Sequence, residues 1–319
     1  MLNKQDYLKN IAKSLNFSKK SIKALLNQNE EETFFDNVDT RVNVNYLNCL
    51  VIVPYLNSLI NNFLNNLNKL CNKYNFSNLN FIIYFFSDQN NLLHYITTIT
   101  KEIKLNYVIT FLNIKSSEYY TIKNNLNITH LTIFNEDEKN LCITYNFENV
   151  SKQLLNYLHI KGHTNLSLFY YENTILTDLL KKIEENSSNF TKNVSFNSIS
   201  QKNITKEIYT FLDSIKFKRN LPTCIILEDE TLTKFFLKAF KEKKILTPYE
   251  ISLISLIDSE VLEVTFPAIT SINYSTELLA EKVIKLLKTT STESLKINRK
   301  EIIECDLIIR SSVSDIYNK

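Results

Sequence analysis

The alternation of two hydrophobic patterns constrains the fold of this chain more than any other feature. The run Cys49–Val53 is apolar at every position and ends at Pro54, and a helical pattern with apolar residues from Ile60 to Leu70 follows it. Strands that are apolar on both faces are typical of parallel sheets, which helices cover on each side. We therefore predict an α/β fold with parallel sheets.

The same alternation continues through most of the chain. Further strands are expected at Leu79–Phe86, Tyr107–Leu112, His130–Phe134, Leu141–Thr144, Leu166–Tyr170, Val194–Phe196, Thr223–Leu227 and Ile251–Leu256. Further helices are expected at Leu92–Ile103, Glu118–Asn125, Glu148–Ile160, Thr174–Asn186, Ile204–Ile215 and Thr231–Lys243. The chain thus divides into two α/β halves that join near Gly162.

Glycine is almost absent, and this absence excludes several functions. The 319 residues contain one glycine, Gly162, where average usage would give roughly 22. Dinucleotide fingerprints, Walker phosphate loops and nucleophile elbows each need two or more glycines. No Ser/His/Asp or Cys/His set, pair of catalytic carboxylates or metal-spaced cluster stands out either. We therefore expect no enzymatic activity, no cofactor and no metal.

The cysteines and the apolar runs indicate the compartment. The five cysteines are scattered and lie mostly in apolar runs, which is typical of buried thiols in a reducing environment. The first residues are polar and lack the apolar core of a signal peptide, and no run approaches ~18 apolar residues. We expect a cytoplasmic protein.

The N-terminal segment has the pattern of a helix-turn-helix. Apolar positions at helical spacing occur from Leu8 to Leu15 and from Ile22 to Leu26, with Asn16 in the turn and Ser18 as the expected N-cap. Six lysines and one aspartate precede residue 28. Such a basic surface attracts DNA phosphates in a manner that salt weakens.

Residues 8–27 resemble the headpiece of LacI/GalR-type repressors, whose turn glycine falls on Asn16. Five later stretches are similar to segments of that family, in the same order. They are Leu158–Leu166, Leu221–Ile226 with the helix ending at Phe240, Pro248–Ile254, Phe266–Ile272 and Leu307–Ser312. The resemblance covers nearly the whole chain.

The resemblance implies a headpiece followed by a two-subdomain, periplasmic-binding-protein-like core. The headpiece and a shortened linker would span residues 1–47, and the effector-binding core residues 48–319. The N-terminal subdomain would comprise about 48–159 and 271–290, and the C-terminal subdomain about 160–270 and 291–313. The family further implies a homodimer that binds double-stranded DNA.

By position in the family motif, Lys19 and Lys20 would read bases in the major groove. The accompanying phosphate, capping or groove-facing residues would be Ser18, Ser21, Lys23 and Asn27. Two departures bear on this role. Ala24 stands where many relatives have arginine, and residues 28–48 are too few for the usual third helix and hinge helix, which carries the minor-groove wedge.

The family also implies a small-molecule effector between the subdomains, beyond the carboxyl ends of the strands. The candidate contacts carry hydroxyl, amide and carboxylate groups, which suit sugar or nucleoside hydroxyls. They are Tyr55, Asn57, Ser58, Asn135, Asp229, Glu230, Asp258 and Tyr274. Solvated loop carboxylates are the alternative interpretation of the acidic members.

The resemblance implies one function and leaves a second open. The first is an effector-responsive transcriptional regulator of the repressor type that binds DNA as a homodimer. The second is a cytoplasmic ligand-sensing protein whose degenerate headpiece no longer binds operator DNA. His163 is expected to be a structural turn residue, and Gly162 is expected to cap a helix with a positive φ.

Overall fold

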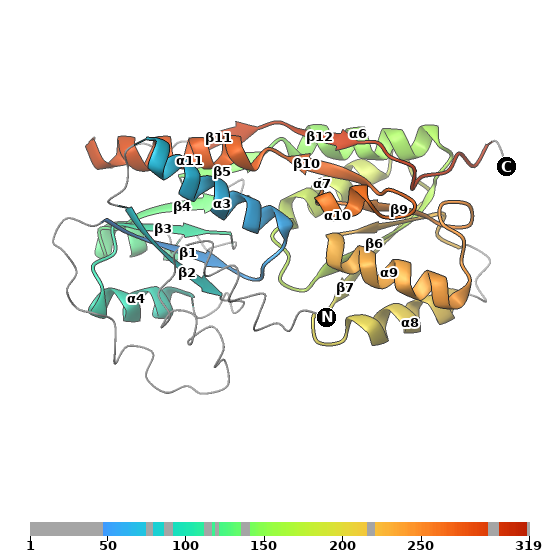
Figure 1. The fold of residues 1–319 in the computed structure, drawn as a ribbon, viewed down its shortest axis with the longest axis horizontal. Helices are drawn as coiled ribbons and strands as arrows, with labels where there is room; N and C mark the ends of the chain where they lie inside the picture. Colours follow the sequence, from blue (N-terminus) through green and yellow to red (C-terminus); the bar gives the residue numbers. More distant parts are fainter. Residues whose placement is uncertain are drawn as a thin grey trace.

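Two α/β lobes lie side by side, and the chain passes between them along one edge of the molecule (Figure 1). The computed structural model describes residues 47–74, 79–85, 92–111, 117–118, 121–134, 141–215, 221–292 and 300–317. The predicted headpiece, apart from Leu47, lies outside these residues. So does Asn135.

The N-terminal lobe is a six-stranded sheet in the order β11-β5-β4-β3-β1-β2, with every pairing parallel. Its strands are β1 (Leu47–Val53), β2 (Leu79–Phe85), β3 (Tyr107–Thr110), β4 (Thr129–Ile133), β5 (Cys142–Tyr145) and β11 (Lys300–Ile303). Its helices are α3 (Ser58–Lys73), α4 (Leu92–Glu102), the short π-helix η2 (Thr121–Asn125) and α11 (Thr276–Thr292), which packs on α3.

Strand β1 shows how the apolar pattern positions the helices of this lobe. Val51 belongs to the large core that includes Phe63 of α3. Its neighbours Leu50 and Ile52 point to the opposite face and pack in a separate cluster with Ile96 of α4. Because successive side chains of a strand point to opposite faces, an all-apolar strand has both faces covered by helices, as predicted.

The C-terminal lobe is a second six-stranded sheet in the order β12-β10-β9-β8-β6-β7. Its pairings are parallel except that β12 runs antiparallel to β10. Its strands are β6 (Asn165–Tyr171), β7 (Asn193–Ile199), β8 (Cys224–Leu227), β9 (Ser252–Ser255), β10 (Thr270–Tyr274) and β12 (Cys305–Ile308). Its helices are α6 (Phe147–Ile160), α7 (Thr177–Ser187), α8 (Ile204–Ile215), α9 (Glu230–Lys243) and α10 (Glu260–Glu263).

The chain passes from one lobe to the other at positions that differ from the predicted subdomain boundaries. Helix α6, expected in the N-terminal subdomain, packs on α7 and β12 of the C-terminal lobe. Strand β10 pairs with β9 and β12, also in the C-terminal lobe, whereas β11, expected there, pairs with β5 in the N-terminal sheet. The apolar pattern of a strand is the same in either sheet, so pairing at the crossings is decided by tertiary contacts.

The single glycine lies where the sequence predicted a helix cap. Gly162 follows the last turn of α6 with φ +84°. Its N–H donates to the His159 carbonyl and the His163 N–H donates to the Leu158 carbonyl, both at 2.9 Å, which is the Schellman arrangement. A Cβ at Gly162 would lie 3.1 Å from the ring of Tyr317, so the position also requires a small residue.

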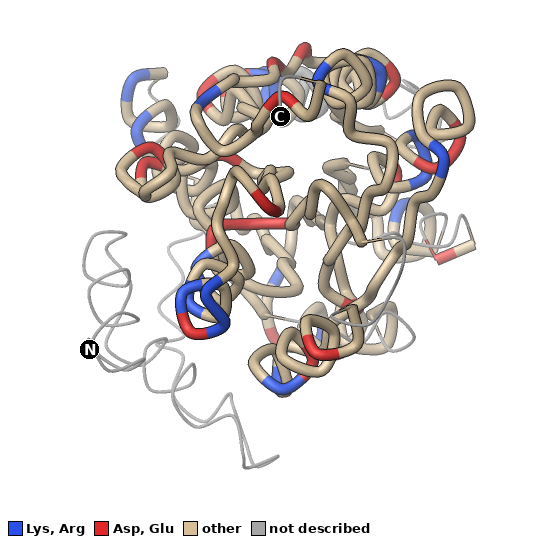
Figure 2. The backbone as a smooth tube through the Cα atoms, turned by 90° about the vertical axis from the view of Figure 1, so that its right-hand side faces the viewer, with Lys and Arg blue, Asp and Glu red and all other residues tan. Residues whose placement is uncertain are grey.

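The lobes have an apolar interior and a charged exterior. All five cysteines are buried and free, as predicted. Figure 2 shows most Lys and Arg positions toward the outside of the molecule and acidic stretches near the centre of the view. No helix among the described residues is long and apolar enough to cross a membrane.

Candidate functional site

Three consecutive carboxylates follow strand β8 in the C-terminal lobe. Glu228 and Asp229 are 0% and 2% exposed, and Glu230 begins helix α9. Because the strands of a parallel sheet end at the same edge, this acidic run lies where ligands bind in open α/β sheets. The run faces the loop that joins β1 to α3 in the other lobe, since side chains of that loop bond to it.

Glu228 joins the two lobes. One oxygen of its carboxyl group accepts a hydrogen bond from the Tyr55 hydroxyl of the N-terminal lobe. The other accepts the backbone N–H of Tyr171, at the end of β6, over 2.7 Å. Burial, together with the neighbouring charge of Asp229, raises the pKa of Glu228 to about 8.

Asp229 holds the start of helix α9. Its Oδ1 accepts the backbone N–H groups of Thr231 and Leu232, both over 3.0 Å, as a helix N-cap. The Tyr171 hydroxyl donates to the same oxygen over 3.1 Å. Burial and the charge of Glu230 raise the pKa of Asp229 to about 7.

Glu230 makes a second link between the lobes. Ser58, the first residue of α3, donates its backbone N–H to Oε1 over 3.1 Å and its hydroxyl to Oε2 over 3.0 Å. The Ser58 hydroxyl also lies 3.2 Å from the carbonyl oxygen of Asp258. The start of α3 is thereby fixed against the start of α9.

Two buried polar groups near this acidic run have no partner among the described residues. Asn57 caps α3 through its Oδ1, which accepts the Ile60 N–H over 2.9 Å, and its Nδ2 is left without an acceptor. Tyr274, at the end of β10, packs edge to face on Tyr145 with ring centroids 4.9 Å apart, and its hydroxyl has no partner. Burial raises the pKa of Tyr274, and the charge of Glu228 is among the smaller causes.

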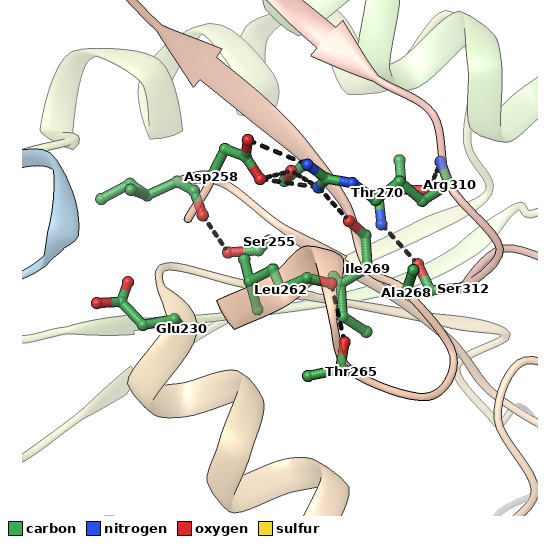
Figure 3. A network of polar contacts seen from close by, with 12 residues as sticks. Glu230, Ser255, Asp258, Leu262, Thr265, Ala268, Ile269, Thr270, Arg310 and Ser312 are labelled. Carbon is green, nitrogen blue, oxygen red and sulfur yellow. Dashed lines mark hydrogen bonds and ion pairs between the residues drawn. The ribbon is translucent and has the colours of Figure 1, made fainter. Parts of the chain in front are cut away.

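Asp258 follows β9 and forms an ion pair within the C-terminal lobe. Its carboxylate binds Arg310 through two contacts of 2.8 and 3.2 Å and accepts the Ser271 hydroxyl over 2.5 Å. Figure 3 shows Asp258 and Arg310 facing each other, while Glu230 lies apart from them at the start of α9. Both Asp258 oxygens are therefore bound to the protein itself.

The structure brings together most of the predicted effector contacts. Tyr55, Ser58, Asp229 and Glu230 belong to one hydrogen-bonded cluster with Glu228 and Tyr171, as the bonds above show. Asn57 and Tyr274 adjoin this cluster, whereas Asp258 is bound to Arg310. Asn135 and the predicted DNA contacts lie outside the described residues; the latter are Ser18, Lys19, Lys20, Ser21, Lys23 and Asn27.

Sequence reasoning missed Glu228 and Tyr171 as members of the cluster. Glu228 belongs to the same acidic run as Asp229 and Glu230, and its position directly after an apolar strand was the signal that could have identified it. Tyr171 is the last residue of β6 and ends an apolar run. His163 is buried and its Nε2 lies 2.9 Å from the Ser314 carbonyl, which supports the structural role expected for it.

Known proteins share this architecture. The family model for a periplasmic binding protein-like domain matches residues 155–313. The chain is 28% identical over 97 residues to the HTH-type transcriptional regulator GalR of Lacticaseibacillus casei. These two matches support the resemblance of the chain to the LacI/GalR family. The alignment with GalR covers 30% of the chain and only 29% of the length of that curated relative.

Solved structures of LacI/GalR-type proteins have the same fold. A LacI family transcriptional regulator from Enterococcus faecium with bound ribose matches with a TM-score of 0.70, 14% identity, and coverage of 84% of this chain and 99% of that one. The lac repressor dimer bound to operator and the anti-inducer ONPF matches with a TM-score of 0.70, 13% identity, and coverage of 85% and 96%. The predicted α/β core and the predicted family resemblance are thus confirmed, and the named relatives are transcription regulators.

Proposed function

We propose that this LacI/GalR-type protein is an effector-responsive, DNA-binding transcriptional regulator that acts as a repressor. It works in the cytoplasm as a homodimer, and it binds rather than transforms its ligand. The effector is a small sugar-like or nucleoside-like molecule held between the lobes.

The observation that carries this proposal is the direct bonding of one lobe to the other at the carboxyl ends of the strands. Tyr55 and Ser58 of the N-terminal lobe donate to Glu228 and Glu230 of the C-terminal lobe. A ligand at this place contacts both lobes at once. It shifts their relative arrangement by the difference in its affinity for the two arrangements, which is the physical requirement for an effector.

The chemistry of the cluster supports a hydroxylated ligand. Carboxylates accept, hydroxyls both donate and accept, and the Asn57 amide nitrogen donates. The proposed contacts are Tyr55, Asn57, Ser58, Asp229, Glu230 and Tyr274, with Glu228 added. The E. faecium regulator of the same fold contains ribose. Asp258 adjoins the site through its carbonyl oxygen, which lies 3.2 Å from the Ser58 hydroxyl, and Asn135 keeps its predicted role.

The DNA-binding and dimeric parts of the proposal rest on the headpiece sequence and on relatives. Lys19 and Lys20 occupy the base-reading positions of the family motif, and the lac repressor of the same fold is a dimer bound to operator. On the C-terminal lobe, Val264 and Phe266 are 82% and 99% exposed. Such exposed apolar side chains favour a surface that a second copy covers.

The test is a selection of DNA by the full chain from a library of random duplexes, at several salt concentrations. We expect one sequence to be enriched and its affinity to fall as salt rises. Replacing Lys19 and Lys20 together by alanine should remove the enrichment. Replacing Lys234 and Lys238, two exposed lysines of α9, removes the same charge from the core and should leave the enrichment intact.

Two outcomes contradict the regulator. One is a selection that enriches nothing at any salt concentration. The other is equal loss of binding in both double-lysine variants, because binding would then depend on net charge alone. If a sugar also raises the melting temperature of the chain, the first outcome favours a ligand-sensing protein with a degenerate headpiece.

A further inference from the structure

The acidic run of Glu228, Asp229 and Glu230 has no cationic partner among the described residues. Its hydrogen bonds come from hydroxyl groups and backbone amides of Tyr55, Ser58, Tyr171 and the first turn of α9. None of the ion pairs between described residues involves these three side chains. Three neighbouring carboxylates are thus held together without a compensating charge.

This arrangement is costly for the protein on its own. Buried carboxylates are normally paired or bind a cation, because desolvation of an isolated charge is unfavourable. The raised pKa of Glu228, about 8, reflects this cost. A positive charge beside the run would favour its ionised form.

Arg310, the one arginine within the part of the chain that the structure describes, does not supply that charge. Arg310 follows β12, and its guanidinium group binds both carboxylate oxygens of Asp258. Its remaining contacts are the Ile269 carbonyl and the Ser271 hydroxyl, each 2.7 Å away. The guanidinium group is therefore held within the C-terminal lobe.

Two buried polar groups point to a ligand independently of the acidic run. Asn57 and Tyr274 are 3% and 5% exposed, and the Asn57 Nδ2 and the Tyr274 hydroxyl lack partners among the described residues. Asn57 lies between Tyr55 and Ser58, which both touch the run. Burial raises the pKa of Tyr274, and the charge of Glu228 is the smallest of the causes. Unpaired buried groups cost free energy that a ligand can recover.

We propose that the effector is a polyhydroxylated primary amine of the amino-sugar type, an inference that rests on the proposed effector-binding function. Its ammonium group lies between Glu228 and Glu230 and donates to both, in place of the Tyr55 and Ser58 hydroxyls. Its oxygen atoms accept from Asn57 Nδ2 and bond with the Tyr274 hydroxyl. An ammonium group has three donors, which matches a run of carboxylates that only accept.

The test compares sugars that differ in one group. D-glucosamine is paired with D-glucose and D-galactosamine with D-galactose, and binding to the full chain is measured at pH 7 by titration calorimetry and by thermal shift. In at least one pair we expect the amine to bind at least tenfold more tightly than its neutral partner. N-acetylation of that amine should reduce its affinity to that of the neutral sugar.

Variants locate the binding to the acidic run. Glu228→Gln and Glu230→Gln keep the shape of each side chain and should each weaken amine binding about tenfold. Glu242→Gln is the matched control, because Glu242 is an exposed residue of the same helix that bonds to Tyr209. Glu230 is only half-buried, so its variant keeps the test valid even if Glu228→Gln fails to fold.

Three results overturn the inference. Neutral sugars that bind as tightly as their amines would overturn it while leaving the proposed sugar-sensing function in place. Amine binding that is unchanged in both Glu→Gln variants would place the amine elsewhere. If no sugar in either set binds while the DNA selection succeeds, the amine effector is wrong and the regulator stands.

Discussion

Acidic side chains follow both β8 and β9, but they are bound by different kinds of partner. The strands are neighbours in register, with Leu227 paired to Ser255. Beyond them, Asp258 is bound by Arg310 within one lobe, whereas Glu228 is bound by Tyr55 from the other lobe. The first pair is self-sufficient, and the second arrangement depends on how the lobes meet.

This difference separates a structural element from a site. Removing one partner of the ion pair should destabilise the C-terminal lobe, because the other buried charge would be left without a partner. Changing the acidic run should instead alter the bonding between the lobes, the affinity for the ligand and the pH dependence of stability.

The largest effect is expected for Arg310→Met. The Arg310 and Asp258 side chains are 13% and 18% exposed, so the variant leaves a mostly buried carboxylate without its partner. We expect the free energy of unfolding to fall by about 3 kcal/mol, measured by urea denaturation. Asp258→Asn in the same chain should recover part of this loss.

The matched control for Arg310→Met is Asp213→Asn, which removes the partner of Lys243 at a site where Asp213 is 62% exposed. Exposed pairs contribute about 0–1 kcal/mol. Equal losses in the two variants would show that the Asp258–Arg310 pair is no more important than a surface contact.

An intermediate effect is expected from pH. Glu228 has a pKa of about 8 in the folded chain against 4.5 ordinarily, so the folded state binds the extra proton. The stabilisation is complete below pH 4.5 and is lost as pH rises through 8. Between pH 6.5 and 8.5 the free energy of unfolding should fall by about 2 kcal/mol through this group.

Glu228→Gln tests the pH prediction, because it removes the titrating group. The titratable neighbours of Glu228 all remain in the variant; they are Asp229, Tyr55 and Tyr171. The pH dependence of the melting temperature over this interval should therefore be shallower in the variant. Parallel pH curves for the two proteins would assign the dependence to other groups.

The smallest effect is expected for Tyr55→Phe. It removes the hydroxyl that links the lobes at Glu228 and should lower the free energy of unfolding by about 1 kcal/mol, measured by thermal unfolding. Tyr209→Phe removes a hydroxyl bonded to the exposed Glu242 and is the control. If the two variants are equally stable, the bond between the lobes contributes no more to the free energy of unfolding than an exposed bond.

Much of the fold could be predicted because local patterns determine it. The run at residues 49–53 became β1 with both faces buried, and the helical patterns at 148–160 and 231–243 became α6 and α9. Asp229 and Glu230 were predicted for the effector site from the family resemblance, which places them beyond the carboxyl end of a strand. Membership of a sheet was harder to predict, because β10 and β11 pair with strands distant in sequence.

Single residues of the site also divide into those that local sequence predicted and those whose role depends on tertiary contacts. Asp258 was predicted as an effector contact, but Arg310 and Ser271 occupy its oxygens. These partners lie 52 and 13 residues away, and no spacing rule connects them. Glu228 was not predicted, because its bond to Tyr55 spans 173 residues and two lobes.

The sequence by itself determined the α/β class, most helices and strands, the family resemblance and the cap at Gly162, since each depends on local hydrophobic pattern, backbone conformation or motif. Only the tertiary structure decided which carboxylate became a structural ion pair and which became part of the site between the lobes. Charges interact through space, and the fold alone places Arg310 beside Asp258 and leaves the acidic run beside Glu228 without a cation.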